Sequence, residues 1–453
     1  MTSRPLLTIV LAAGKGTRMK SAIPKVLHRV GGLSLLGHVL RTVGEAGSDR
    51  IAVVIGPEME AVGAEVEARA PGAEVFIQDQ QLGTAHAVLA ARSAIEGHTG
   101  DVLVAFADTP LIMPDSLSGL AGCLDAETAV AVLGFEAADP TGYGRLLCDE
   151  AGHVTAIREH KDASAIERAV TLCNAGVMAF RGERLLALLD AIATDNAQQE
   201  YYLTDAVAIA RAKGGRVGVR TCPEEEVLGV NSRNQLAIAE AVFQRRFRER
   251  VMADGATLIA PETVWFSHDT QIGRDVTIEP NVFFGPRVVV EDEVLIHANS
   301  HMEGARLHRG AEIGPFARLR PGADLGPRSK IGNFVEVKNT TVEEGAKANH
   351  LSYLGDGRVG AGANIGAGTI FCNYDGFFKY RTEIGPGAFI GSNTSLVAPV
   401  TIGEGAFIGS GSVITKDVPA DALALERSEQ STREGWAAKF KTIMKRRKEQ
   451  ARS

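Results

Sequence analysis

The sequence predicts two folded units of different classes: an α/β N-terminal domain with a Rossmann-like sheet, and a C-terminal parallel β-helix of hexapeptide repeats. The chain has 453 residues, which exceeds the usual size of one domain. Short apolar runs alternate with helix-like stretches up to about residue 229, whereas from about residue 258 an aliphatic residue recurs every six positions. We therefore expect domains over 1–229 and 251–453, connected by a helix over 230–250.

The composition is that of an ordinary globular protein. Hydrophobic residues make up 45% of the chain and charged residues 23%, which argues against disorder. The net charge of −7 gives no global basic field that would attract nucleic acid. The apolar run Leu6–Ala13 is too short to span a bilayer, so we expect no membrane insertion. The cysteines are scattered without a CxxC pair, which favours a reducing, cytoplasmic location over a disulfide scaffold or a zinc site: Cys123, Cys148, Cys173, Cys222 and Cys372.

Strand–helix alternation in the first half indicates an open sheet that binds ligands at the carboxyl ends of its strands. A charged amphipathic stretch from Leu236 to about Met252 predicts the connecting helix. The predicted buried strands are Leu6–Leu11, Ile51–Ile55, Val102–Phe106 and Ala129–Phe135, and the helical segments between them include Leu35–Ala46 and Ala85–Ile95.

The second half has the pattern of a β-helix. The six-residue register runs, for example, from Ile272 to Ile278 and from Ile402 to Ile408, with a glycine often following the aliphatic residue. One aliphatic side chain per short strand points into a narrow triangular core, and glycines allow the tight corners, so the repeat also accounts for most of the excess among the 50 glycines. The segment from Phe371 to Glu383 interrupts the repeat, and such insertions often gather on a functional face. A pure oligomerisation scaffold is the alternative.

The segment Leu11–Met19 is a candidate phosphate loop. It follows a predicted buried strand, and its small residues let backbone N–H groups approach an anion. The Walker A pattern is absent, and Met19 stands where GxGxxG would have its third glycine. Pro24-Lys25 follows closely, and the combined pattern LAAGxGTRM…PK resembles that of the sugar-1-phosphate nucleotidyltransferases.

Further segments resemble the uridylyltransferase branch of that superfamily in its own order: Gln80–His86, Phe106–Leu111, Thr141–Arg145, Glu159–Asp162, Asn174–Gly176, Glu200–Asp205 and Gly229–Asn231. With the hexapeptide half, the chain resembles the bacterial bifunctional N-acetylglucosamine-1-phosphate uridylyltransferase/glucosamine-1-phosphate N-acetyltransferases from Leu6 to about Arg433. This likeness implies synthesis of UDP-N-acetylglucosamine from UTP, glucosamine 1-phosphate, N-acetylglucosamine 1-phosphate and acetyl-CoA, with Mg²⁺ in the uridylyl step. The residues implied to bind UTP or UDP-N-acetylglucosamine are Leu11, Ala12, Ala13, Gly14, Arg18, Lys25, Gln78, Gly83, Thr84, Phe106, Ala107, Asp108, Gly144, Glu159, Asn174 and Asn231.

Asp108 and Asn231 are the candidate Mg²⁺ ligands. In-line attack of a sugar phosphate on UTP needs positioning and charge neutralisation and no covalent protein nucleophile. Because Mg²⁺ takes few protein oxygens, the Asp108 carboxylate with the Asn231 amide oxygen is an adequate pair. Lys25 and Arg18 supply cations for phosphate oxygens. The structural alternatives are a turn cap for Asp108 and a cap of the connecting helix for Asn231.

His350 is the candidate catalytic base for acetyl transfer, which requires a neutral amine. It lies in the segment Asn349–Asp356, NHLSYLGD, which resembles the acetyltransferase motif of the family. Ala348 replaces the aliphatic residue of this unit, so the sequence pattern is locally disturbed where the chemistry is suspected. A packing or surface histidine is the alternative.

The resemblance also implies the remaining features of acetyl transfer. The β-helices of this family are left-handed and trimerise, which implies a homotrimer with acetyl sites between neighbours. Phe106-Ala107 stands where similar enzymes often have Tyr-Gly, and Ser410 stands where alanine is common. Glucosamine 1-phosphate is expected at Arg320, Lys338, Tyr353 and Asn364, and acetyl-CoA at Ala367, Asn373, Tyr374, Ser392, Ser410 and Arg427.

Two other function classes compete with a bifunctional enzyme. A monofunctional sugar-1-phosphate nucleotidyltransferase with a regulatory or oligomerising β-helix would not require His350, Lys338 or the inserted loop. A non-catalytic assembly module similar to those of translation factors is expected to have lost Lys25 or Asp108. The four residues and the inserted loop are all present, which favours the bifunctional enzyme. The basic tail over 433–453 is interpreted as a solvated helix, with a role near the CoA phosphates or in nucleic-acid or membrane binding as alternatives.

Overall fold

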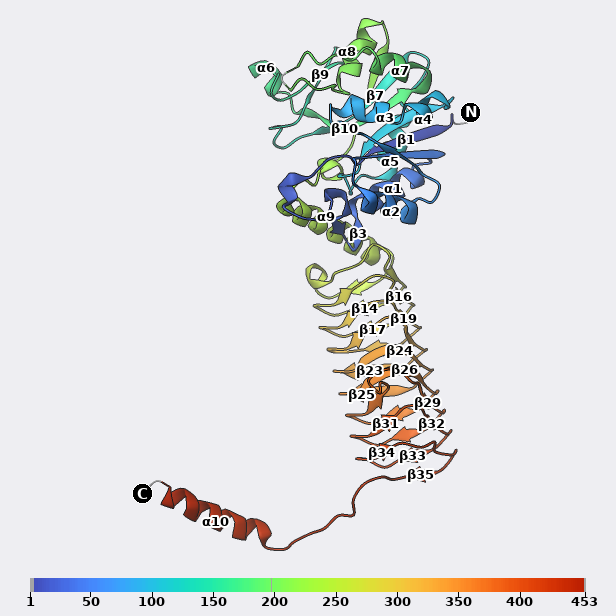
Figure 1. Ribbon diagram of the computed structural model, residues 1–453, viewed down its shortest axis with the longest axis vertical. Coiled ribbons are helices and arrows are strands. Elements are labelled where there is room, and N and C mark those ends of the chain that lie inside the picture. The colour runs from blue at the N-terminus through green and yellow to red at the C-terminus, as the bar shows by residue number, and fades with distance from the viewer. Residues whose placement is uncertain (1–3, 197, 452–453) are drawn as a thin grey trace. The chain divides into compact units, whose positions relative to one another are not determined.

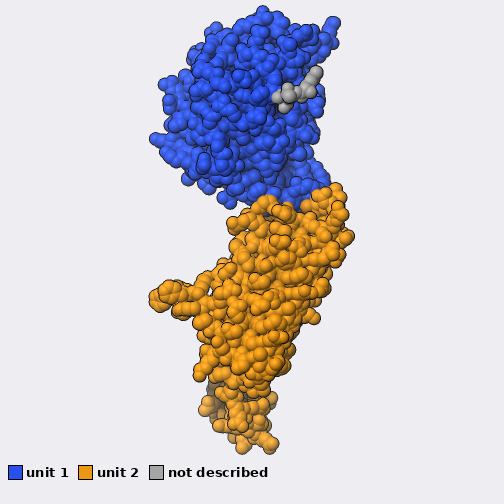
Figure 2. All heavy atoms as spheres, turned by 90° about the vertical axis from the view of Figure 1, so that its right-hand side faces the viewer, with its two compact units in different colours: residues 1–250, 266–268 blue, residues 251–265, 269–453 orange. Residues whose placement is uncertain are grey.

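The computed structural model describes residues 4–196 and 198–451 and forms two compact units (Figure 1). Unit 1 comprises residues 1–250 and 266–268, and unit 2 comprises residues 251–265 and 269–453 (Figure 2). The main boundary therefore falls within helix α9 (Arg233–Ala253), which begins three residues before the expected Leu236.

Unit 1 contains a mixed sheet with the strand order β11-β7-β10-β6-β1-β4-β5. Strand β10 runs antiparallel to both β6 and β7, whereas β1 pairs in parallel with β4 and β6. The α/β expectation is confirmed, and each of the four predicted strands is present. The strands are β1 (Leu6–Leu11), β4 (Arg50–Ile55), β5 (Glu74–Ile77), β6 (Asp101–Phe106), β7 (Thr128–Glu136), β10 (Leu172–Arg181) and β11 (Arg216–Thr221), with β8 (Arg145–Cys148) and β9 (Val154–Arg158) attached through β10.

Helices cover both faces of this sheet, because side chains of each strand alternate between two hydrophobic clusters. Leu7 and Ile9 of β1 belong to one cluster, and Leu6 and Val10 belong to the other. The stretch Ala85–Ile95, expected as one helix, is split into two. The helices are α1 (Leu35–Glu45), α2 (Glu60–Arg69), α3 (Thr84–Ala90), α4 (Arg92–Glu96), α5 (Pro114–Ala121), α6 (Ala165–Arg168), α7 (Gly182–Leu189) and α8 (Asp205–Ala212).

Unit 2 is a parallel β-helix with three faces, which confirms the solenoid prediction (Figure 1). We call the ten-stranded face A: β12 (Thr257–Leu258), β14 (Thr277–Ile278), β17 (Leu295–Ile296), β20 (Glu312–Ile313), β23 (Lys330–Asn333), β25 (Lys347–His350), β27 (Asn364–Ile365), β30 (Phe389–Ile390), β33 (Phe407–Ile408) and β35 (Leu423–Ala424). The other two faces share the long strands β24 (Glu336–Val342) and β26 (Tyr353–Val359), which turn the corner between them. Their remaining strands are β13 (Gln271–Ile272), β15 (Phe283–Phe284), β16 (Val289–Val290), β18 (His301–Met302), β19 (Ala305–Leu307), β21 (Arg318–Leu319), β22 (Ala323–Leu325), β28 (Ile370–Cys372), β29 (Thr382–Ile384), β31 (Ser395–Val397), β32 (Val400–Ile402) and β34 (Val413–Ile414).

The β-helix keeps its register at Ala348, where the sequence pattern is disturbed. Ala348 is buried and pairs with Ile331 on one neighbouring coil and Ile365 on the other, so it simply takes the inward place of the aliphatic residue. The expected insertion is present as a loop between β28 and β29, where Tyr374 and Lys379 form an isolated bridge.

The chain ends in helix α10 (Trp436–Gln450), and every residue over 425–451 is exposed. Over the parts of the chain that the structure describes, no helix has the length and apolarity needed to cross a membrane.

Candidate active sites

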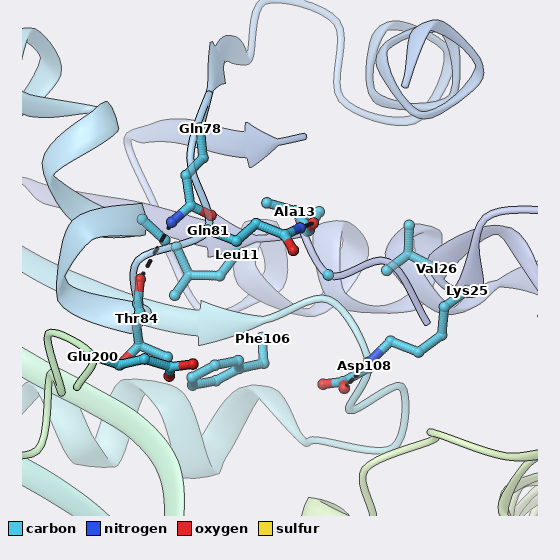
Figure 3. Close-up of a pocket in the computed structure, with 14 residues that line it drawn as sticks. Leu11, Ala13, Lys25, Val26, Gln78, Gln81, Thr84, Phe106, Asp108 and Glu200 are labelled. Atoms are coloured by element: carbon cyan, nitrogen blue, oxygen red, sulfur yellow. Dashed lines mark hydrogen bonds and ion pairs between the residues drawn. The ribbon is translucent and has the colours of Figure 1, made fainter. Parts of the chain in front are cut away.

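A cavity of about 330 Å³ lies at the carboxyl ends of β1 and β6 (Figure 3). This is the edge at which an α/β sheet is expected to bind ligands. Most of the residues predicted for the nucleotide line the cavity: Leu11, Ala12, Ala13, Gly14, Lys25, Gln78, Gly83, Thr84, Phe106 and Asp108. Val26, Gln81, Ala87 and Glu200 complete the lining.

Two glycines permit the close approaches that shape this cavity. A Cβ at Gly16 would lie 2.4 Å from Cβ of Lys25, and a Cβ at Gly83 would lie 2.6 Å from the carbonyl oxygen of Tyr201. Both glycines have a positive φ, +62° for Gly16 and +116° for Gly83, a backbone conformation that residues with a side chain rarely adopt. The first places Lys25 directly beside the phosphate loop. The second lets the Ala85 N–H donate to the Tyr201 carbonyl, joining the predicted uracil segment to Glu200–Asp205.

Polar side chains fix the predicted base-reading segment. Gln78 is buried and its Nε2 donates to the carbonyl of Gly83 at 3.3 Å. Gln81 donates from Nε2 to the carbonyl of Ala13 at 2.6 Å, which connects this segment to the phosphate loop (Figure 3). The Gln81 contact was not predicted, although the residue lies within the quoted motif.

The two candidate metal ligands converge on one cation. Nζ of Lys25 donates to Oδ2 of Asp108 at 2.5 Å and to Oδ1 of Asn231 at 3.0 Å (Figure 3 labels Lys25 and Asp108). The Val230 N–H donates to the Asp108 carbonyl at 2.8 Å, holding the two segments together. A carboxylate and an amide oxygen around a positive charge fit the preferences of Mg²⁺. Among the described residues there is no group of three or more His, Cys, Asp or Glu side chains placed to hold a metal, so this pair is a sparse site.

A second cavity, of about 390 Å³, shares Thr84, Phe106 and Glu200 with the first. It is lined by Glu159 and Asn174, two residues that were predicted to contact the sugar. Burial, followed by the charges of Asp162 and Asp205, raises the pKa of Glu159. The Asn174 N–H donates to the carbonyl of Gly144 at 2.8 Å, which brings Gly144 to the rim.

The structure places some predicted residues outside the lining of these cavities. Arg18 is exposed on the 3₁₀ helix Thr17–Met19, and Ala107 is fully buried behind the cavity wall. Gly144 and Asn231 adjoin the cavities through the contacts above. Glu200, which lines both cavities, lies in a quoted segment but was not singled out, because a sequence does not reveal which side chains of a loop point inward.

In unit 2, His350 heads a column of predicted acetyl-CoA residues. Ala348, Ile365, Ile390 and Ile408 are successive inward residues of face A, and the residues two positions after them are His350, Ala367, Ser392 and Ser410. Backbone hydrogen bonds connect these corners, from Gly368 to His350 at 3.3 Å, from Asn393 to Ala367 at 2.7 Å and from Gly411 to Ser392 at 2.8 Å. Arg427 joins the column by donating from Nη1 to the carbonyl of Ser410 at 2.9 Å. This alignment was not predicted, because the residues lie on different coils and are far apart in the sequence.

The predicted sugar-phosphate residues form a second cluster. Nη1 of Arg320 donates to Oε1 of Glu336 at 2.9 Å, and Nζ of Lys338 lies 3.3 Å from both carboxylate oxygens of Asp356. Tyr353 pairs with Glu336 in the sheet and lies over Gly355, where a Cβ would be 2.4 Å from the Tyr353 hydroxyl.

The inserted loop adds a cation and an amide to this cluster. The hydrogen bond and positive charge of Lys338 lower the pKa of Lys379, and the charge of Arg320 acts in the same direction, because neighbouring positive charges disfavour the protonated amine. Burial alone would raise the pKa of Asp356, but hydrogen bonds from Asn339 and Lys338 hold it below its usual value. Nδ2 of Asn373 donates to Asp356 at 2.6 Å.

The groove that contains His350 is not lined by Arg320, Lys338 or Tyr353. The groove of about 470 Å³ beside His350 is lined by His297, Glu312, Gly314, Pro315, Lys330, Gly332, Asn333, Lys347, Asn349 and His350. Asn364 lies on β27, half-buried, and Tyr374 is exposed on the inserted loop. The contacts of Glu336, Asp356 and Lys379 were not predicted.

Comparisons with known proteins cover both units. Residues 8–173 match the model of the MobA-like NTP transferase domain, and residues 381–416 match that of the bacterial transferase hexapeptide (six repeats). Three relatives named "Bifunctional protein GlmU" are similar over 97% of this chain and 98% of their own: those of Azorhizobium caulinodans (60% identical), Xanthobacter autotrophicus (59%) and a Bradyrhizobium species (58%). Because these matches extend through both units, the monofunctional alternative is not favoured, and the chain belongs to the bifunctional GlmU family of transferases.

Proposed function

We propose that the two units of this bifunctional transferase carry out successive steps in the synthesis of UDP-N-acetylglucosamine. Unit 2 transfers the acetyl group of acetyl-CoA to the amine of glucosamine 1-phosphate, and unit 1 then transfers uridylyl from UTP to N-acetylglucosamine 1-phosphate, releasing pyrophosphate. The observation that carries the proposal is the presence, in separate units, of a phosphate cavity around Lys25 and Asp108 and a histidine-headed column beside a cationic cluster.

For uridylyl transfer, the chain binds and orients two anions in adjoining cavities. Lys25 neutralises phosphate charge, Gln78 and Gly83 hold the base, and Glu159 and Asn174 hold the sugar. Mg²⁺ bound by Asp108 and Asn231 would supply further positive charge at the phosphates. Phe106 lines both cavities. Its side chain has no hydroxyl, so it contributes packing and no hydrogen bond.

For acetyl transfer, His350 accepts the proton of the attacking amine, while Arg320, Lys338 and Lys379 bind the sugar phosphate. Acetyl-CoA lies along the column of Ala367, Ser392 and Ser410. A homotrimer would let a neighbouring chain bring the two clusters into one site. Exposed stacked pairs of aromatic rings on the β-helix support such an assembly: Phe316 with Phe334 and Phe389 with Phe407. The cysteine pattern favours a cytoplasmic location.

The test is to incubate the purified protein with glucosamine 1-phosphate, acetyl-CoA, UTP and Mg²⁺. Release of both CoA and pyrophosphate is expected. Absence of CoA would overturn the acetyl half of the proposal, and release of CoA without pyrophosphate would overturn the uridylyl half. Mixing His350→Ala chains with Arg320→Ala chains tests the assembly, because hybrid trimers with shared sites should recover activity. No recovery after verified subunit exchange would mean that the two residues act within one chain.

A further inference from the structure

We propose that Glu226 is a positioning residue for the metal site, because its carboxylate ties the segment that carries Asp108 to the segment that carries Asn231. The inference rests on the proposed uridylyl transfer and adds a residue to that site. Asp108 lies between β6 and α5, and Asn231 lies between the 3₁₀ helix Glu224–Val227 and α9. The two candidate ligands thus depend on segments that are distant in the sequence.

Glu226 connects these segments by two hydrogen bonds. Its side chain is buried, with 6% of the residue exposed. Oε2 accepts from the N–H of Met113 at 3.2 Å and from the Oγ hydroxyl of Ser116 at 2.6 Å. Met113 is the N-cap residue of α5, and its side chain makes no capping hydrogen bond. The Glu226 carboxylate therefore accepts hydrogen bonds at this end of the helix in its place. A negative charge is favoured there by the helix dipole.

Arg246 of α9 holds the same two segments. Its Nη1 donates to the carbonyl of Leu111 at 2.8 Å, and its Nε and Nη2 donate to Oε1 of Glu225 at 3.0 and 2.9 Å. Glu225 and Glu226 are neighbours in the 3₁₀ helix, so this helix contacts the loop after Asp108 at two points. Together with the hydrogen bond from Val230 to Asp108, the contacts fix how far apart the two ligand-bearing segments lie.

This fixed spacing matters because Mg²⁺ demands near-octahedral geometry, and Asp108 and Asn231 would be the two residues that hold it. Glu226 does not line the nucleotide cavity, so it has no direct contact with UTP. Loss of its charge should therefore weaken metal binding more than it weakens UTP binding. A residue that only stabilised the fold would not produce that difference.

The test substitutes Glu226→Gln, which keeps the size of the side chain and removes its charge. Mn²⁺ binding in the presence of UTP is measured by electron paramagnetic resonance, together with the Mg²⁺ dependence of pyrophosphate release. We expect both half-saturating concentrations to rise about tenfold, as is typical when a group that orients a metal ligand is lost, with KM for UTP at saturating Mg²⁺ changing much less. Glu224→Gln is the matched control, since Glu224 lies on the same 3₁₀ helix and instead accepts from the Ala138 N–H at 3.3 Å.

Ser116→Ala provides a second variant, because it removes one of the two donors and is expected to shift metal binding in the same direction. If Glu226→Gln fails to fold, Ser116→Ala decides the question. Unchanged Mn²⁺ binding in the folded variants would overturn the inference and leave the proposed function intact. A wild-type protein that releases pyrophosphate without any divalent ion would instead overturn the metal-dependent reaction on which the inference rests.

Discussion

Nδ1 of His350 lies 2.6 Å from Oδ1 of Asn333, its register partner on the preceding coil of the β-helix. An amide oxygen can only accept a hydrogen bond, so in the neutral imidazole this contact favours the tautomer with the proton on Nδ1 and the lone pair on Nε2. The pairing fixes both the tautomer and the orientation of the imidazole, which are the properties that a general base requires.

Asn333→Ala should therefore slow acetylation while the protein remains folded. We expect a loss of about tenfold, smaller than the 10²–10⁴-fold that a general base contributes as a whole. Asn333→Asp is the matched variant, since a carboxylate oxygen also accepts from Nδ1, and it should retain much more activity than the alanine variant. CoA release at saturating acetyl-CoA measures both. Equal rates for wild type and Asn333→Ala would mean that the imidazole needs no orienting partner.

Asp108→Ala should abolish UTP-dependent pyrophosphate release and leave acetylation nearly unchanged. The Asp108 carboxylate contacts Lys25 and adjoins Asn231 in unit 1, and the acetyl cluster is built from unit 2 residues. Treatment with EDTA should reproduce this separation, because only the uridylyl step is proposed to use a divalent ion. The two products are assayed in the same preparation, and parallel loss of both activities in a folded variant would contradict two independent sites.

The features of the fold that were predictable are those that local periodicity encodes. Strand β1 matches its prediction residue for residue, because a strand buried on both faces is a continuous apolar run. The β-helix could be predicted because inward-facing aliphatic residues, such as Ile278 and Ile296, recur at a fixed spacing in the sequence. The antiparallel direction of β10 and the break at Ala91 have no such local signal.

For the candidate sites too, the residues of sequence motifs could be predicted and the contacts between distant segments could not. Lys25, Asp108 and Thr84 were predicted because their segments resemble the motifs of the nucleotidyltransferases, and the structure brings them into one cavity. The roles assigned to these residues stay predictions. Contacts such as Asp356 with Asn373, or Glu226 with Ser116, join residues that are far apart in sequence and depend on side-chain directions, which periodicity does not encode.

The stability of unit 1 should decrease as the pH falls from 6.5 toward 4, because of His38. Burial lowers the pKa of His38 from 6.5 to about 4, while Nε2 hydrogen-bonds the Val30 carbonyl at 2.7 Å. The unfolded chain therefore takes up a proton near pH 6.5, where the folded chain does not. The contribution of His38 to stability is complete above pH 6.5 and is lost progressively as the pH falls toward 4. The whole shift corresponds to about 3 kcal/mol.

Pulse proteolysis in urea at pH 7 and pH 5, following the intact N-terminal unit, measures this dependence. His38→Gln can still donate a hydrogen bond to Val30 and cannot take up the proton, so its urea midpoint should change less between the two pH values. A wild-type midpoint as independent of pH as that of the variant would assign acid sensitivity to other groups.

His350→Ala tests the catalytic base itself. The acetylation rate should fall by roughly 10²–10⁴-fold with a much smaller change in KM for either substrate, because proton removal matters in the transition state. The wild-type rate should fall on the acidic side of its pH profile as the imidazole becomes protonated, and the variant should lose that dependence. Raising the pH should partly rescue the variant, since more of the amine is then already neutral.

If His350 were only a packing residue, the variant would instead show a lower melting temperature, impaired assembly and an unchanged pH profile in its active fraction. A stably folded variant that acetylates glucosamine 1-phosphate at the wild-type rate would rule out His350 as the base.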